Sequence, residues 1–148
     1  QQGQKLQFGD ATMKILSPEP GAEGTDPNEE GLVMELCYGK FRGLFTGDIG
    51  EETEKKLLPR LDDVDFLKVG HHGSMYSSCQ EFLDRIQPEV AVISCSESNT
   101  YGHPSPETIK RLEQNGIKTM YTMKSGAVTV STDGGHMWME TFCDGKTA

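Results

Sequence analysis

The chain has 148 residues, of which 34% are hydrophobic and 25% charged, the proportions of an ordinary globular domain. Acidic residues outnumber basic ones by 23 to 14, for a formal net charge of −9, which argues against tight, non-specific DNA binding by the chain alone. No apolar run is long enough to cross a membrane, and no cysteine pair has the CxxC spacing of a four-thiolate zinc site.

The first part of the sequence alternates short strands with turns. Alternating apolar residues predict the strands, and Gly9-Asp10 and Gly39-Lys40 predict tight turns between them. Between these pairs lies an acidic segment rich in Pro and Gly, residues 17–30, which is typical of a mobile surface loop. The strands are expected at Lys5–Phe8, Thr12–Leu16, 31–38 and 41–47.

Three repetitions of strand and helix follow. Glu51–Leu61 has acids in its first turn and bases later, which suits a helix dipole. Ser78 and Glu81 have the spacing of a capping box that opens a second helix, and Ser105-Pro106 predicts the start of a third. The remaining strands are expected at 64–69 and 90–94, and then in a terminal meander at 117–122, 127–131 and 136–141.

This order of elements predicts an α/β chain with a mixed sheet and helices on one face. Loops that follow strands and precede helices are where such sheets place ligands. Three of these loops hold Asp48, then His71 and His72, and then His103. Of the four histidines only His136 lies elsewhere, where it opens the last strand and is expected to be structural.

Imidazole and carboxylate are ligands that suit zinc, manganese and iron, and a carboxylate can bridge two cations about 3.5–4 Å apart. Each loop alone would more often be a turn or a surface segment, but three at successive strand ends favour a shared site. A serine hydrolase and a dinucleotide-binding fold are disfavoured, because the sequence has no GxSxG elbow and no GxGxxG after a strand.

Together these segments resemble the metallo-β-lactamase-like domain of the ComEC DNA-uptake family. The resemblance covers about residues 5–142 and rests on GD, HHGS and YGHP motifs in the family's order. The strings that carry it are FTGDIGEETEKKLL, DFLKVGHHGS, EVAVISCSESNTYGHPSPETIKRLEQNGIKTMYT and KSGAVTVSTDG.

The resemblance implies that the chain is the C-terminal half of a metallo-β-lactamase αββα sandwich. Asp48 would match the bridging aspartate of the metal centre. Either His71 or His72 would match the late metal-binding histidine, and the other would line the substrate side. His72 and His103 would be the catalytic residues. The residues expected to contact substrate are Gly73, Ser74, Asn99, Tyr101 and His103.

The implied cofactor is a divalent metal, Zn or Mn, with two ions in the intact enzyme. The implied reaction is hydrolysis of a phosphodiester by metal-bound hydroxide, with a nucleic acid or nucleotide as the substrate. The family includes secreted and surface-anchored relatives, which favours such a location.

The family's HxHxDH motif is absent from this sequence, which is expected to begin beyond it. Asp48 with one or two histidines is too few for a catalytic zinc, which takes three protein ligands and water. The inner sheet face would be bare, and the chain would pair with the missing N-terminal half or with itself. The residues expected near that face are Val33, Leu44, Phe45, Leu67 and Val92.

The leading interpretation is therefore part of a metal-dependent hydrolase that is inactive without its other half. One alternative is a non-catalytic module that keeps the fold and binds a ligand or a partner. The other is a plain α/β domain with incidental histidines.

Overall fold

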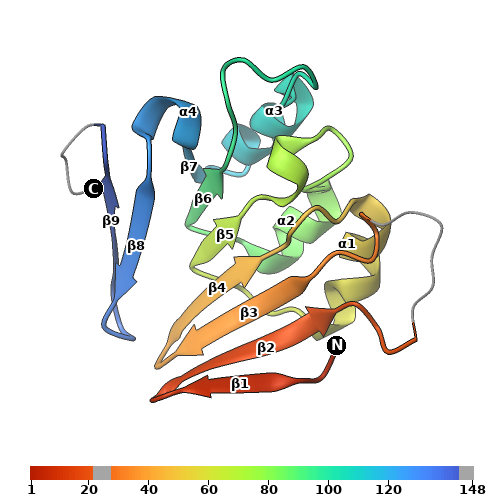
Figure 1. Cartoon of the computed structure of the whole chain (residues 1–148), viewed down its shortest axis with the longest axis vertical. Coiled ribbons are helices and arrows are strands. Elements are labelled where there is room, and N and C mark those ends of the chain that lie inside the picture. The colour runs from red at the N-terminus through yellow and green to blue at the C-terminus, as the bar shows by residue number, and fades with distance from the viewer. Residues whose placement is uncertain (22–27, 144–148) are drawn as a thin grey trace.

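The computed structural model describes residues 1–21 and 28–143, so the expected acidic loop lies partly outside the described residues. Seven strands form one mixed sheet in sequential order (Figure 1). The first four are antiparallel neighbours, and the last four run parallel to one another. The strands are β1 (Lys5–Phe8), β2 (Ala11–Ser17), β3 (Val33–Tyr38), β4 (Phe41–Phe45), β5 (Phe66–Lys68), β6 (Val90–Ile93) and β7 (Lys118–Tyr121).

Helices cover one face of this sheet, as the sequence predicts (Figure 1). Because β4 to β7 are parallel, each connection between them crosses that face. The helical elements are α1 (Glu51–Leu57), η1 (Leu58–Arg60), η2 (Gly70–Gly73), α2 (Gln80–Ile86), α3 (Pro106–Gln114) and α4 (Thr122–Ser125). Within the described ranges, none of these helices is long and apolar enough to traverse a bilayer.

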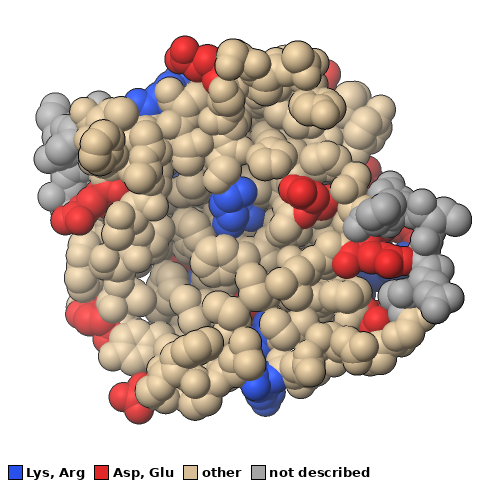
Figure 2. Space-filling model, viewed as in Figure 1, with Lys and Arg blue, Asp and Glu red and all other residues tan. Residues whose placement is uncertain are grey.

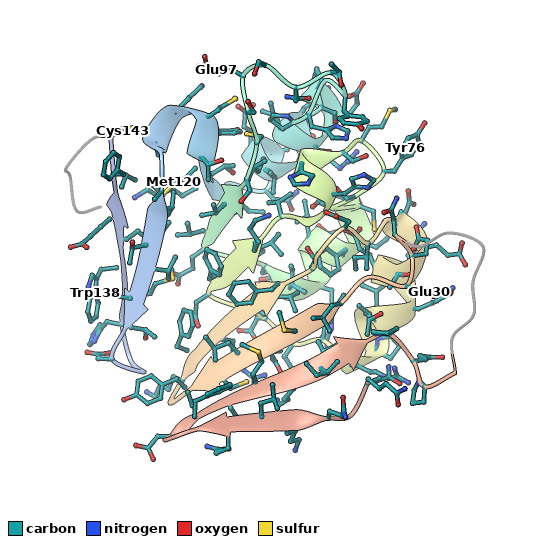
Figure 3. The ribbon with its side chains drawn as sticks, viewed as in Figure 1. Glu30, Tyr76, Glu97, Met120, Trp138 and Cys143 are labelled. Atoms are coloured by element: carbon teal, nitrogen blue, oxygen red, sulfur yellow. The ribbon has the colours of Figure 1, made fainter. Side chains whose placement is uncertain are left out.

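The opposite face is partly covered by a separate hairpin, β8 (Val128–Thr132) and β9 (Met137–Thr141). This corrects the expected meander, because β7 pairs with β6 in the main sheet and not with β8. Met120 lies between the sheet and the hairpin, whereas Trp138 points outward (Figure 3). The hairpin therefore forms a second, smaller apolar core with β4 to β7.

The expected bare face was assigned incorrectly for three residues. Val33, Leu44 and Leu67 are fully buried in the core between the sheet and the helices. Phe45 and Val92 do lie on the opposite face, in the smaller core. The error arises because neighbouring strand residues point to opposite faces, and an all-apolar strand does not reveal which side each residue occupies.

The start of α2 also differs from the expected capping box. Ser78 has a left-handed backbone with φ of 55°, and its hydroxyl has no hydrogen-bond partner. The backbone N–H groups of Ser78 and Cys79 instead donate to the buried Glu54 carboxylate of α1, at 2.5 and 2.8 Å. The predicted cap of α3 is confirmed, because Thr108 N–H donates to Ser105 Oγ at 3.1 Å.

Glu35 of β3 is a nearly buried carboxylate between two cations. It accepts hydrogen bonds from Lys14 Nζ at 2.8 Å and Arg42 Nη1 at 3.0 Å. Burial by itself raises the pKa of Glu35, but the hydrogen bonds and charges of Lys14 and Arg42 outweigh burial and hold the pKa below its usual value. Such a carboxyl stabilises the fold above its unfolded-state pKa, and this contribution is lost as pH falls through the folded-state pKa.

We therefore expect Glu35→Gln to be less stable than the wild type by about 1–2 kcal/mol at pH 7, the scale of a charged hydrogen-bonded pair. The difference should shrink as pH falls below 4.5, the ordinary pKa of the group. Urea unfolding at several pH values between 7 and 3 measures it. The exposed Glu97→Gln is the matched control, and a Glu35→Gln difference that stays constant with pH would contradict the assignment.

Candidate functional site

The three predicted loops meet at one edge of the sheet, because β4, β5 and β6 are parallel and end on the same side. The first loop is held against the second by two hydrogen bonds. His71 N–H donates to Gly47 O at 2.9 Å, and Thr46 Oγ1 donates to Lys68 O at 2.9 Å. Gly47 has φ of 54°, and a Cβ there would lie 2.9 Å from Leu32 O, so only glycine fits next to Asp48.

His71 and His72 occupy η2 with left-handed backbone angles, φ of 46° and 55°. Residues other than glycine rarely adopt this conformation, which costs about 1–3 kcal/mol and clusters at functional sites. Two successive left-handed residues turn the chain sharply. As a result the two imidazoles, although adjacent in sequence, face different surroundings.

The His72 ring is oriented by a hydrogen bond from Nδ1 to Ser94 O, 2.8 Å away. Since a carbonyl can only accept, Nδ1 carries the proton, and in the neutral ring Nε2 keeps its lone pair. Nε2 lies 3.8 Å from Asp48 Oδ1, and both side chains are about half exposed. This is the arrangement of a metal-binding histidine whose second nitrogen is fixed by a backbone carbonyl.

The pair fits two ligands of one cation. Zinc lies about 2.0–2.2 Å from nitrogen and oxygen ligands, so two ligands of a tetrahedral ion are separated by about 3.4 Å. A separation of 3.8 Å needs only a small shift to match. Within residues 1–21 and 28–143, no third His, Cys, Asp or Glu side chain brings a ligand atom close enough to both members of this pair to share a cation with them.

His103 lies near the two histidines of the second loop, but it is not within ion-pair distance of Asp48. Its ring lies 5.6 Å from that of His71 between centroids, edge to face. His103 and His72 line a common cavity of about 460 Å³, whereas His71 lines a different one with Glu29 and Tyr76. Burial, followed by the charges of His71 and His72, lowers the pKa of His103, which favours its neutral form at pH 7.

Asn99 holds the third loop closed. Its Nδ2 donates to the carbonyls of Ser96 and His103, both at 2.6 Å, and its Oδ1 accepts from His103 N–H at 2.9 Å. Its amide is therefore already engaged in positioning His103. Tyr101 is 81% exposed and stacks on His103 with a centroid distance of 6.0 Å, so it remains open to a ligand.

Gly73 and Ser74 join the second loop to the third. Ser74 is buried, and its carbonyl accepts from Thr108 Oγ1 at 2.7 Å. Gly73 has φ of 80°, and its carbonyl accepts from Ser105 N–H at 2.8 Å. A Cβ on Gly73 would lie 2.7 Å from Pro104 Cβ, so this close approach requires glycine.

Sequence reasoning missed the residues that line a second cavity beside His72. This cavity, of about 360 Å³, contains Lys68, Ser94 and Thr122 among its lining residues. The available signal was a lysine in an otherwise apolar strand, separated from the HHGS motif by Val69 and Gly70. His136 lies on the exposed hairpin turn next to Asp133 and not in these three loops.

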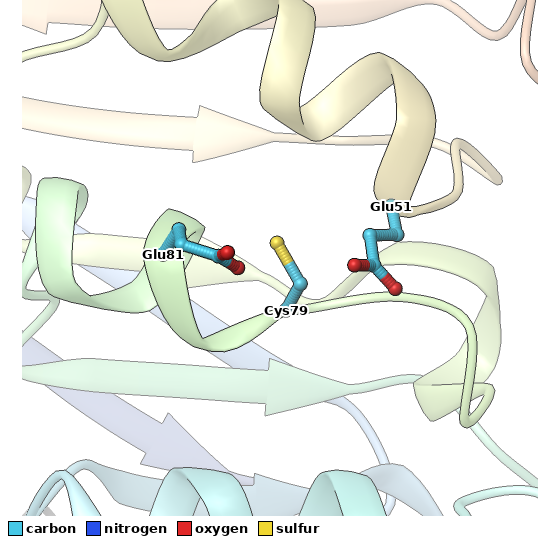
Figure 4. A group of neighbouring side chains, drawn as sticks. All are labelled: Glu51, Cys79 and Glu81. Carbon is cyan, nitrogen blue, oxygen red and sulfur yellow. The ribbon is translucent and has the colours of Figure 1, made fainter.

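A compact group of ligand-type side chains, Glu51, Cys79 and Glu81, lies between α1 and α2 (Figure 4). Lys55 Nζ is 2.6 Å from Glu51 and 3.8 Å from Glu81, so a protein cation already contacts both carboxylates. Burial raises the pKa of the Cys79 thiol to about 12, and a protonated thiol is a poor metal ligand. This group is therefore better explained as a helix–helix contact.

Comparison with known proteins gives several close matches in sequence, although no protein-family model matches the chain. The chain is 33% identical over 128 residues to ComE operon protein 3 of Bacillus subtilis, covering 85% of the chain and 16% of that protein. It is 32% identical over 128 residues to competence protein ComA of Neisseria gonorrhoeae, covering 84% of the chain and 18% of that protein. The chain thus spans about one sixth of these relatives.

Two solved structures share its fold. A putative metal-dependent hydrolase from Parabacteroides distasonis aligns with a TM-score of 0.54 and 11% identity, over 82% of this chain and 56% of that one. The metallo-beta-lactamase fold protein YhfI from Bacillus subtilis aligns with a TM-score of 0.54 and 12% identity, over 94% of this chain and 54% of that one. At these identities the likeness establishes the fold alone.

Proposed function

The chain belongs to the ComEC-like family of competence proteins, of which it matches one segment, and it has the metallo-β-lactamase fold. From this premise we propose that the chain forms part of a metal-dependent phosphodiesterase. The observation that supports the proposal most is the orientation of His72. Its Nδ1 is fixed by Ser94 O, and its Nε2 lies 3.8 Å from Asp48 Oδ1. Two donors are thus held ready for one cation.

In this proposal Asp48 and His72 hold a divalent metal, Zn or Mn, and Asp48 can bridge to a second ion. The bound metal would lower the pKa of water to about 7 and polarise the scissile phosphate. His103, neutral and in the same cavity as His72, is placed to accept or donate a proton near the reacting group. His71 lines the other cavity and is proposed to have a structural role in the loop instead of binding the metal.

The remaining ligands would come from a segment outside this chain. Two donors fall short of the three that a catalytic zinc needs, and the chain corresponds to 54–56% of the solved structures that share its fold. The chain alone is therefore proposed to be inactive. The substrate would be a nucleic acid or nucleotide, attracted by bound metal and not by the acidic surface.

The test is hydrolysis of bis-p-nitrophenyl phosphate by the complete protein that contains this chain. We expect activity with Zn or Mn, loss of activity with EDTA, and recovery when metal is restored. Metal binding without hydrolysis under any of these conditions would favour the alternative of a non-catalytic binding module. If the protein neither binds metal nor hydrolyses the diester, both functional readings fail and only the assignment of the fold remains.

The sheet face opposite the helices supports the idea of a missing partner. Leu6, Met13 and Leu36 are opposite one another on β1, β2 and β3, so their side chains share this face. Leu6 and Phe8 are 49% and 58% exposed. Figure 2 shows this face as mostly uncharged, with most charged groups near its rim. We propose that it receives the other half of the sandwich.

Without that half, the isolated chain is expected to self-associate through this face. Exposed apolar area of this kind is uncommon on stable monomers. Light scattering after size-exclusion chromatography should give a mass above that of one chain, and the double variant Leu6→Ser, Phe8→Ser should shift it toward the monomer. Tyr76→Ser, which removes a 68% exposed side chain from a different surface (Figure 3), is the control. A strictly monomeric wild type would contradict the prediction.

A further inference from the structure

Lys68 occupies an unusual position at the end of β5. Side chains alternate along the strand, so Lys68 and Phe66 point away from the helices while Leu67 points toward them. Lys68 lines the cavity of about 360 Å³ together with aromatic and aliphatic side chains of the sheet and hairpin. A half-buried ammonium group thus faces a largely apolar cavity.

The charge of Lys68 has no partner of opposite sign in contact. Its Nζ donates to Val69 O at 3.0 Å. Among residues 1–21 and 28–143, no carboxylate lies within 4.0 Å of it. By contrast, Lys14, Lys55 and Lys56 each contact a glutamate at 2.6–2.8 Å. A desolvated cation without an anion is unfavourable, and burial accordingly lowers the pKa of Lys68, while the charge of Asp48 raises it.

The cavity of Lys68 adjoins that of His72. Ser94 and Thr122 line both cavities, and Ser94 O is the group that orients the His72 ring. Asp48 is close enough for its charge to act on Lys68. An anion held by Lys68 would therefore lie next to the Asp48–His72 pair, with the Ser94 and Thr122 side chains beside it.

We propose that Lys68 binds a non-bridging phosphoryl oxygen of the substrate and positions the phosphodiester beside Asp48 and His72. This deepens the proposed function and rests on it. An ammonium is a compact point charge with three donors, suited to a phosphate oxygen, and within residues 1–21 and 28–143 the only hydrogen bond from Lys68 Nζ is the one to Val69 O. The apolar walls strengthen the attraction by excluding water.

The first experiment compares Lys68→Met with Lys68→Arg in the complete protein. With bis-p-nitrophenyl phosphate, Lys68→Met should raise KM at least tenfold, and Lys68→Arg should recover most of that loss. Metal content should be unchanged, and hydrolysis of the neutral ester p-nitrophenyl acetate should be little affected. Lys124→Met, which removes an exposed lysine elsewhere, is the control.

Two outcomes would overturn the inference. An unchanged KM for the diester would show that Lys68 does not contact it. Loss of metal or of folding in Lys68→Met, together with a normal KM in any folded fraction, would mean that Lys68 serves the structure, for example by pairing with a carboxylate from another segment.

A second experiment needs no substitution and no catalysis. Inorganic phosphate is titrated into wild-type protein with isotope-labelled lysine, and the Nζ resonance of Lys68 is followed by NMR. A saturating shift at Lys68 with none at Lys124 supports the inference, and an unmoved resonance at tens of millimolar phosphate overturns it. If no diester is hydrolysed, the proposed function fails on its own, and this titration still decides the role of Lys68.

Discussion

Replacing Asp48 with Asn is expected to weaken divalent-metal binding by the complete protein more than about 100-fold. Loss of an outer partner of a metal ligand already costs about 10- to 100-fold, so loss of the ligand itself should cost more. Asparagine keeps the size of the side chain but removes the charge opposite His72 Nε2. Metal content after gel filtration and isothermal titration with Zn or Mn measure the effect, and hydrolysis should fall with it.

Two comparisons make this result specific. Asp10→Asn changes an exposed aspartate in the β1–β2 turn and should leave metal binding intact. His72→Gln should resemble Asp48→Asn, whereas His71→Gln should retain most of the metal, because only His72 approaches Asp48. Full metal occupancy in Asp48→Asn, or the reverse order for the two histidines, would contradict the proposed ligands.

The second large effect is expected at Gly73. Alanine there meets two separate costs: a left-handed backbone, at about 1–2 kcal/mol, and a Cβ placed 2.7 Å from Pro104 Cβ, at about 1–3 kcal/mol for overpacking. We expect Gly73→Ala to lower the free energy of unfolding by about 2–5 kcal/mol. Because Pro104 follows His103, the site should be displaced as well.

Gly102 provides a matched control for Gly73. It has φ of 70°, but nothing lies within 4 Å of the position its Cβ would take. Gly102→Ala should therefore show only the backbone cost, about 1–2 kcal/mol. Thermal and urea unfolding of both variants separate the two contributions. Equal destabilisation by the two substitutions would mean that the contact between Gly73 and Pro104 does not matter.

Local patterns predicted the order of the elements well, because strands, turns and the Ser105 cap depend on residues close together in sequence. The capping box at Ser78 failed for the opposite reason. Its backbone donors are taken by Glu54, which is 24 residues away and reaches them only once α1 packs against α2. A local rule has no access to that competitor.

In the site, too, the features set by local sequence were predicted and those set by tertiary contacts were not. The sequence places Asp48, the two histidines and His103 at neighbouring strand ends, and parallel strands bring those ends together. It leaves open which histidine faces Asp48, because that depends on left-handed angles at both positions and on Ser94 O. The burial of Ser74 was hidden too, since it results from packing against α3.

The backbone at His71 and His72 would suit glycine better than any other residue. Imidazole is thus placed where local conformational preference opposes it, and the fold gives up some thermodynamic stability at the point where its chemistry is proposed to occur. His71→Gly is expected to gain stability from the backbone alone. Thermostability screens of this protein would therefore tend to enrich changes that dismantle the loop, so they need a metal-binding readout alongside.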